Sequence, residues 1–232
     1  MNKLLGIVAV AAVGMAVGGW MMQRGSDSAT AVQMPPIANS AQAQTSASEI
    51  DTSRVIEMSV GDPDAPVTIL EFASLTCPHC ANFNQGVYRQ LVDTYVDTGV
   101  VRIVKREVFF DAFGLWAAMV ARCGGPERFH GIIDMLYQHQ SDWSRAQPAS
   151  GQSEAEAVAD ALRRIGRRAG LNNDELNACL EDRDMALAMM EVYRQGAEQY
   201  GITSTPSFVI NGRRYSNMSF EDFSAAIAAA QR

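Results

Sequence analysis

The stretch Leu70-Glu71-Phe72-Ala73-Ser74-Leu75-Thr76-Cys77-Pro78-His79-Cys80 decides the fold of this chain. It begins within the apolar run Val67 to Phe72, which is typical of a buried strand, and a helical pattern follows from Ala81 to Val96. A strand, a turn that holds two cysteines, and a helix together display a redox-active dithiol. Unpaired backbone N–H groups and the helix dipole favour a thiolate at Cys77, so we expect Cys77 to be the nucleophile.

The segments around this turn predict an α/β sheet. Apolar residues recur every fourth position after the cysteines, which indicates a helix with one buried face. A second short apolar run, Val100 to Val104, follows that helix. The order of strand, helix and strand implies a parallel pair joined by a crossover helix.

Residues 111 to about 185 predict an all-helical insertion, because the apolar spacing becomes helical and each segment ends at a stop signal. Ser153 and Glu156 form a capping box at the start of one of these helices. The predicted helices of this region and the one after it cover residues 112–123, 127–139, 153–169, 173–180 and 184–200.

The C-terminal segment returns to strands. Ser207 to Ile210 and Arg213 to Tyr215 are joined by Asn211-Gly212, a preferred two-residue hairpin turn. A closing amphipathic helix follows, marked by apolar residues from Phe220 onward. We therefore expect one folded domain in two parts, residues 51–110 and 186–232, which are separated by the insertion at 111–185.

The first fifty residues predict export. Lys3 precedes an uncharged run from Leu4 to Met22, whose 19 residues would span about 28 Å as a helix. That length favours an uncleaved membrane anchor that comprises residues 1–24. A cleaved signal peptide is the alternative, because glycines weaken the hydrophobicity of the run and Ala29-Thr30-Ala31 offers a cleavage site. Residues 25–50 predict a flexible linker, and the positive charge at Lys3 orients the remainder across the membrane, into the periplasm.

The chain has a net charge of −7, whereas proteins that bind nucleic acid usually carry an excess of positive charge. We therefore expect no nucleic-acid partner.

Residues 51–232 resemble a DsbA-like thiol-disulfide oxidoreductase. The resemblance is carried by the stretch quoted first and by a second one, Gly201-Ile202-Thr203-Ser204-Thr205-Pro206-Ser207-Phe208-Val209-Ile210-Asn211-Gly212. It implies a thioredoxin fold, of the α/β class, with an inserted all-helical domain.

The resemblance also implies a role for each site residue. Cys77 exchanges disulfides with the substrate and Cys80 resolves the mixed disulfide, while Thr205-Pro206 is a cis peptide bond that faces both sulfurs and binds substrate. An ordinary trans proline at the edge of a strand is the alternative for Pro206. Within the Cys77-Pro78-His79-Cys80 turn, His79 would support the Cys77 thiolate, or else be an exposed residue without function.

Glu71 is a carboxylate inside an apolar strand, where a charge is costly without a partner. In the family that this chain resembles, an acid at the position of Glu71 assists proton transfer at the buried sulfur, here Cys80. The alternative is an outward-facing strand residue. Lys105 and Arg106 are both candidate partners for Glu71, and the sequence leaves the choice open.

The other cysteines, Cys123 and Cys179, predict a structural disulfide within the helical insertion, with free thiols as the alternative. A structural zinc site needs about four converging ligands. The CxxC pair would have to take the others from Cys123, Cys179, His130 or His139 in the predicted helical insertion, so we expect no metal. The two histidines are interpreted as surface residues of helices. Phe113, Trp116 and Met119 are assigned to the core of the insertion.

These features predict a disulfide oxidase that acts on reduced exported proteins and requires no cofactor. A membrane quinone-linked oxidase of the DsbB type is the implied partner, and we expect a monomer because no dimerising module is visible. The same scaffold as a reductase or isomerase is an alternative. A non-catalytic binding or metal-handling module with a static disulfide at residues 77–80 is another.

Overall fold

A computed structural model describes residues 50–232 of the chain. The predicted signal or anchor segment and nearly all of the predicted linker lie outside the described residues. Among residues 50–232 we find no helix with the length and apolar character that a membrane crossing requires.

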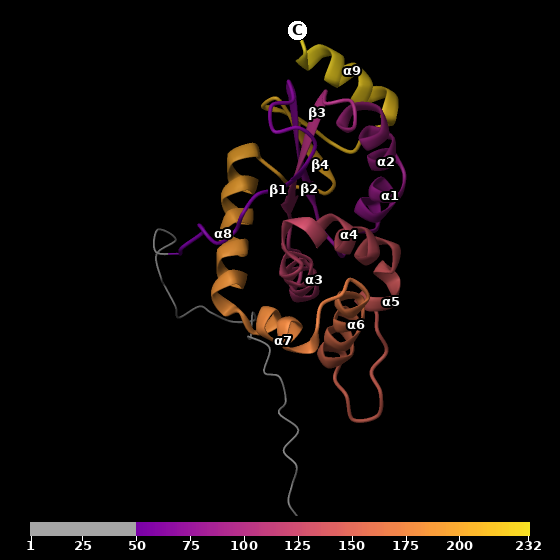
Figure 1. Cartoon of the computed structure of the whole chain (residues 1–232), viewed down its shortest axis with the longest axis vertical. Helices are drawn as coiled ribbons and strands as arrows, with labels where there is room; N and C mark the ends of the chain where they lie inside the picture. The colour runs from indigo at the N-terminus through magenta and orange to yellow at the C-terminus, as the bar shows by residue number, and fades with distance from the viewer. Residues whose placement is uncertain (1–49) are drawn as a thin grey trace, which may run out of the picture. The chain divides into compact units, whose positions relative to one another are not determined.

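A mixed sheet forms the centre of the described part of the chain (Figure 1). Its strands lie in the order β1-β3-β2-β4-β5, with β2 and β3 parallel and the other neighbours antiparallel. The parallel pair and its helical crossover confirm the prediction from the sequence. The strands are β1 (Met58–Val60), β2 (Val67–Ala73), β3 (Val101–Glu107), β4 (Ser207–Ile210) and β5 (Arg213–Tyr215).

The hairpin between β4 and β5 has the predicted turn. Asn211 and Gly212 both have positive φ, 42° and 87°, as a type I′ turn requires. The Asn211 side chain also accepts a hydrogen bond from the backbone N–H of Thr68, at 2.9 Å. The turn therefore anchors the edge of the sheet to the start of β2.

Helices cover both faces of the sheet. On one face, α1 (Pro78–Gln85), α2 (Val87–Leu91) and α9 (Phe220–Ala230) pack against apolar residues of β2 and β4. The Phe83 ring lies 4.7 Å from that of Phe208 and 5.8 Å from that of Phe223, measured between centroids. On the other face, α8 (Arg183–Tyr200) runs past the sheet (Figure 1). The ring of Tyr200 packs there against that of Phe72.

The crossover differs from the single helix predicted over residues 81–96. Helix α1 begins three residues earlier, because Pro78 tolerates the first helical position, where no N–H is needed. Gly86 then leaves the helical region with φ −118° and ψ −93°, which separates α1 from α2. A π-helical turn over Val92–Val96 completes the connection.

The inserted helices lie together beyond one end of the sheet (Figure 1). They surround an apolar core that includes Trp116, Phe129 and Trp143. The predicted capping box of Ser153 and Glu156 is present. This arrangement confirms the predicted α/β fold with helices inserted between β3 and α8. The helices are α3 (Ala112–Cys123), α4 (Gly125–Gln138), α5 (Gln140–Ser144), α6 (Glu154–Arg168) and α7 (Asn173–Glu181).

Candidate active site

The two cysteines of the turn differ in their access to solvent. Cys77 is the N-cap residue of α1, and its carbonyl accepts hydrogen bonds from the backbone N–H groups of Cys80 and Ala81 at 3.1 and 3.2 Å. Both cysteines are free thiols, with Cys77 9% exposed and Cys80 only 1%. Pro78 and His79 are exposed between them. Cys77 is therefore the sulfur that a second molecule can reach first.

His79 does not contact the thiol through a hydrogen bond. Among the hydrogen bonds found within residues 50–232, none involves the His79 side chain. The predicted support of Cys77 by His79 therefore stays a prediction.

The fold brings the second sequence motif to the first. The Thr205-Pro206 peptide bond is cis, and the Cys77 thiol donates a hydrogen bond to the Thr205 carbonyl with a sulfur–oxygen distance of 3.6 Å. The Ser207 hydroxyl donates to the Ser204 carbonyl at 2.7 Å and holds the loop from within. A backbone carbonyl thus lies at the accessible sulfur, although 128 positions separate the two residues in sequence.

Glu71 lies inside the sheet, where it forms an ion pair with Lys105. The parallel register places the two residues side by side on one face, and Lys105 Nζ donates to Glu71 Oε2 at 2.7 Å. Arg106 pairs instead with Glu57 at 2.8 Å, so Lys105 is the partner that the sequence left open. The outward-facing alternative for Glu71 is wrong, because its side chain is 1% exposed.

The charge of Glu71 stabilises the charged form of Lys105. Burial alone would lower the pKa of Lys105, but the Glu71 carboxylate raises that pKa above its ordinary value. The ring of Tyr88 lies 3.8 Å below the ammonium group and adds a cation–π contact. The other carboxylate oxygen, Glu71 Oε1, is buried and has no hydrogen-bond partner among the described residues.

The interior around Cys80 disfavours charge. Burial raises the pKa of the Cys80 thiol far above its ordinary value. Burial likewise raises the pKa of Tyr137, whose hydroxyl donates to the Ser74 carbonyl at 3.4 Å. A thiolate released at Cys80 would therefore take up a proton readily.

Gln140 is a residue of the site that sequence reasoning missed. Its Nε2 donates hydrogen bonds to the carbonyls of Leu75 and Cys77, at 2.7 and 3.0 Å. It lies in α5, a helix of five residues, which is too short to leave a periodic signal. The inserted helices thus hold the backbone of the dithiol turn from outside the sheet.

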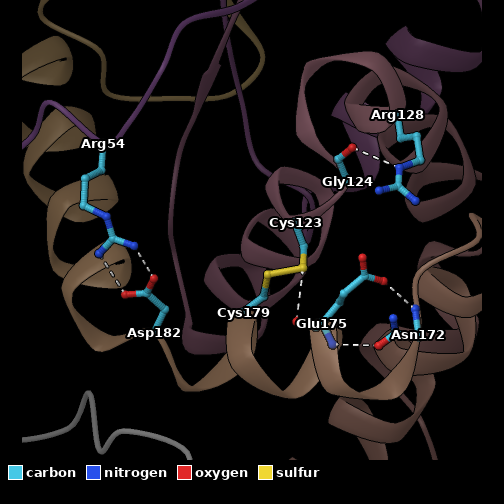
Figure 2. The surroundings of a disulfide bond; sticks show 8 residues. All are labelled: Arg54, Cys123, Gly124, Arg128, Asn172, Glu175, Cys179 and Asp182. Atoms are coloured by element: carbon cyan, nitrogen blue, oxygen red, sulfur yellow. Dashed lines mark hydrogen bonds and ion pairs between the residues drawn. A yellow bond between two sulfur atoms is a disulfide. The ribbon is translucent and has the colours of Figure 1, made fainter.

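The disulfide predicted for the insertion is present. Cys123 at the end of α3 forms a disulfide with Cys179 in α7 (Figure 2). The free-thiol alternative is therefore wrong. Beside the disulfide, Asn172 and Glu175 form a capping box at the start of α7. An ion pair between Arg54 and Asp182 holds the residues before β1 to the junction of α7 and α8 (Figure 2).

The assignment of His130 to the surface is wrong. Its ring is partly buried, and Nε2 lies 3.1 Å from the Ser59 carbonyl oxygen of β1. His139 is more exposed and pairs with Asp142 at 3.1 Å. Among the described residues, no three histidine, cysteine or acidic side chains gather in a way that could hold a metal ion.

With this geometry described, comparison with known proteins is informative. The sequence signature of the family described as thioredoxin matches residues 53–229, about three quarters of the chain. The chain belongs to the thioredoxin family. Membership agrees with the sheet order, the position of the cysteines at the start of α1 and the Thr205-Pro206 loop opposite them.

Within the thioredoxin family, the chain is similar to proteins whose names refer to disulfide chemistry. A Rickettsia bellii protein named "Putative protein-disulfide oxidoreductase" is 29% identical over 175 residues, and the match covers 75% of this chain and 64% of that protein. A protein of the same description from Rickettsia prowazekii is 30% identical over 178 residues, with 75% and 61% covered. The chain thus spans less than two thirds of the length of these relatives.

A solved structure is similar over more of its length. The crystal structure of alpha-DsbA1 from Wolbachia pipientis superposes with a TM-score of 0.67 at 25% identity, covering 75% of this chain and 90% of that one. This likeness supports the DsbA-like variety of the thioredoxin fold, with helices inserted between β3 and α8.

Proposed function

We propose that this chain is a thiol-disulfide oxidoreductase that works as an oxidase, donating a disulfide between Cys77 and Cys80 to reduced proteins. One observation carries the proposal. The accessible sulfur of Cys77 lies at the N-terminus of α1 and against the Thr205 carbonyl, with the buried thiol of Cys80 one helical turn behind. This geometry separates an attacked sulfur from a leaving sulfur.

The reaction consists of two exchanges. A client thiolate attacks Cys77 Sγ in the oxidised protein, which forms the mixed disulfide, breaks the bond to Cys80 and releases the Cys80 thiolate. A second client thiolate then attacks the client sulfur of the mixed disulfide and releases the Cys77 thiolate. The client loses two electrons and the protein gains them.

Backbone groups of the loop opposite the cysteines would hold the client. The Thr205 carbonyl accepts a hydrogen bond from the free thiol, and in the mixed disulfide that thiol hydrogen is gone. The carbonyl is then free to accept from a client N–H, as in strand addition. Thr205 and Pro206 are the substrate-binding residues of this proposal.

The proton that Cys80 takes up would come through Glu71. The environment of Cys80 raises its pKa, so the released thiolate is a strong base. Glu71 Oε1 is buried without a partner, whereas Oε2 is held by Lys105, so one carboxylate oxygen is free to carry a proton. We assign Glu71 this relay role and Lys105 the role of holding it in place.

The compartment and partners follow from the N-terminal sequence and the chemistry. The apolar run after Lys3 supports export to the periplasm, with the chain either anchored there or released by cleavage. Reduced exported proteins are the clients. Because the protein leaves each cycle reduced, a quinone-linked membrane oxidase of the DsbB type would reoxidise it, and the protein works as a monomer.

A glutathione redox titration tests the oxidase direction. Alkylation with peptide mass spectrometry would follow the pair at 77 and 80 separately from Cys123 and Cys179. A potential between those of DsbA and protein disulfide isomerase, about −120 to −180 mV, supports a disulfide donor. A potential near that of thioredoxin, about −270 mV, would instead support a reductase.

Insulin reduction by dithiothreitol tests the competing binding module. A catalytic pair accelerates the reaction and Cys77→Ser abolishes the acceleration, whereas a static disulfide has no effect. Because an isomerase also accelerates this reaction, recovery of scrambled ribonuclease would separate that alternative.

A further inference from the structure

A hollow lies in the surface directly beside the dithiol. Thr76 and Pro78, the two neighbours of Cys77, both line it. The remaining walls come from the start of α3 and from α5 with the residue after it, and the Thr205-Pro206 loop contributes none of them. These other lining residues are Asp111, Phe113, Gln140, Ser141, Ser144 and Arg145.

Two polar residues of the hollow already have partners. Asp111 accepts hydrogen bonds on both carboxylate oxygens, from the Gly114 N–H at 2.8 Å and from the Thr76 hydroxyl at 2.9 Å. Its charge also lies at the N-terminus of α3, where the helix dipole stabilises it. The Gln140 amide donates both of its hydrogen bonds to the carbonyls of Leu75 and Cys77.

The groups that stay free in the hollow can all donate hydrogen bonds. The hydroxyls of Ser141 and Ser144 and the guanidinium of Arg145 have no hydrogen-bond or ion-pair partner among residues 50–232. Two hydroxyls and an unpaired cation complement a carboxylate, which only accepts hydrogen bonds. The half-buried ring of Phe113 provides an apolar wall for the stem of such a side chain.

We propose that this hollow is a subsite for an acidic side chain of the client, placed one or two residues from the client's reacting cysteine. The inference rests on the proposed exchange at Cys77. An extended chain advances about 3.3 to 3.6 Å per residue, so a client cysteine bonded to Cys77 brings its neighbours to a hollow lined by Thr76 and Pro78. Arg145 is the specificity-determining residue.

The test uses the full-length chain carrying Cys80→Ala, so that the mixed disulfide accumulates. It is mixed with glutathione disulfides of three peptides that differ only in Glu, Gln or Lys beside the cysteine. The Cys77 thiolate attacks the peptide sulfur, forms the protein–peptide disulfide and releases one glutathione thiolate. Acid quenching and mass spectrometry give the equilibrium constant for each peptide.

We expect the Glu peptide to exceed the Gln peptide by about two- to fivefold in equilibrium constant, the range of a partly exposed ion pair. Arg145→Glu should reverse the order of the Glu and Lys peptides, and Arg145→Gln should remove the preference. Sodium chloride at 1 M should erase it in the unsubstituted site. Arg164→Glu is the matched control: Arg164 is an exposed arginine of α6 outside the hollow, and the preference should persist there.

The outcomes separate this inference from the proposed function. Exchange with all three peptides at equal equilibrium constants would overturn the subsite and leave the oxidoreductase intact. A preference that survives in both Arg145 variants would overturn it as well. No exchange with any peptide would overturn the proposed function and the subsite together.

Discussion

Lys105 and Glu71 form an ion pair inside the sheet, with Lys105 Nζ 2.7 Å from Glu71 Oε2 and both side chains almost fully buried. Moving two charges into the interior is costly, and their attraction offsets that cost only in good geometry. The parallel register of β2 and β3 supplies the geometry, because it places the two residues opposite each other on one face. The stability of the sheet and the proposed proton relay therefore depend on the same contact.

Lys105→Met should destabilise the protein by about 3 to 5 kcal/mol, because it leaves the Glu71 carboxylate buried without a partner. The double variant Glu71→Leu with Lys105→Met removes both charges and should lose less. Urea unfolding followed by circular dichroism measures both. A Lys105→Met midpoint equal to that of the unsubstituted protein would show that the pair does not stabilise the fold.

Alkylation should distinguish the two cysteines of the reduced turn. At pH 8 we expect iodoacetamide to modify Cys77 at least about tenfold faster than Cys80, since burial raises the pKa of Cys80 and hides its sulfur. Peptide mass spectrometry of timed samples gives both rates. Faster labelling of Cys80 would reverse the roles assigned to the two sulfurs.

Gln140→Leu should weaken the dithiol turn, because two carbonyls lose the donor that satisfies them. We expect about 1 to 3 kcal/mol less stability and slower insulin reduction. Gln138→Leu is the control, since Gln138 is exposed near the same place in sequence and has no side-chain hydrogen bond among those found. Equal effects of the two substitutions would exclude a specific role for Gln140.

Removing the disulfide between Cys123 and Cys179 should lower the stability of the protein and leave its thiol-disulfide exchange activity in place. Cys123 and Cys179 close a loop with a sequence separation of 56, which restricts the unfolded chain by about 4 kcal/mol in the entropy account. The double variant Cys123→Ala/Cys179→Ala should unfold at lower urea and still accelerate insulin reduction. A loss of activity as complete as that of Cys77→Ser would overturn the purely structural role.

His130 should make stability depend on pH. Burial lowers its pKa in the folded protein, and the neighbouring Lys105 lowers it further. The unfolded state therefore binds the proton first as the pH falls. The stability that comes from keeping His130 neutral is fully present above about pH 6.5 and is lost as the pH falls through the lowered pKa of the folded protein. His130→Gln should flatten the pH dependence of the unfolding free energy below about pH 6.5, measured by urea unfolding at a series of pH values.

The local sequence was enough to predict most elements of the fold. The apolar run of β2, the Asn211-Gly212 turn and the capping box at Ser153 each have a signature that lies within a few residues of sequence, so each could be predicted locally. The same signals failed at Gly86 and at α5. A glycine break and a five-residue helix produce no periodic pattern long enough to detect.

The sequence by itself determined the dithiol turn and most strands and helices, because these follow from short motifs and their spacing. The roles expected of Glu71 and of Thr205-Pro206 came from the resemblance to a known family. Only the tertiary structure decided which cation meets Glu71, that His130 is partly buried, and that Gln140 holds the carbonyl of Cys77. These contacts join residues 34 to 71 positions apart. They depend on strand register and on the packing of the inserted helices, which no local pattern encodes.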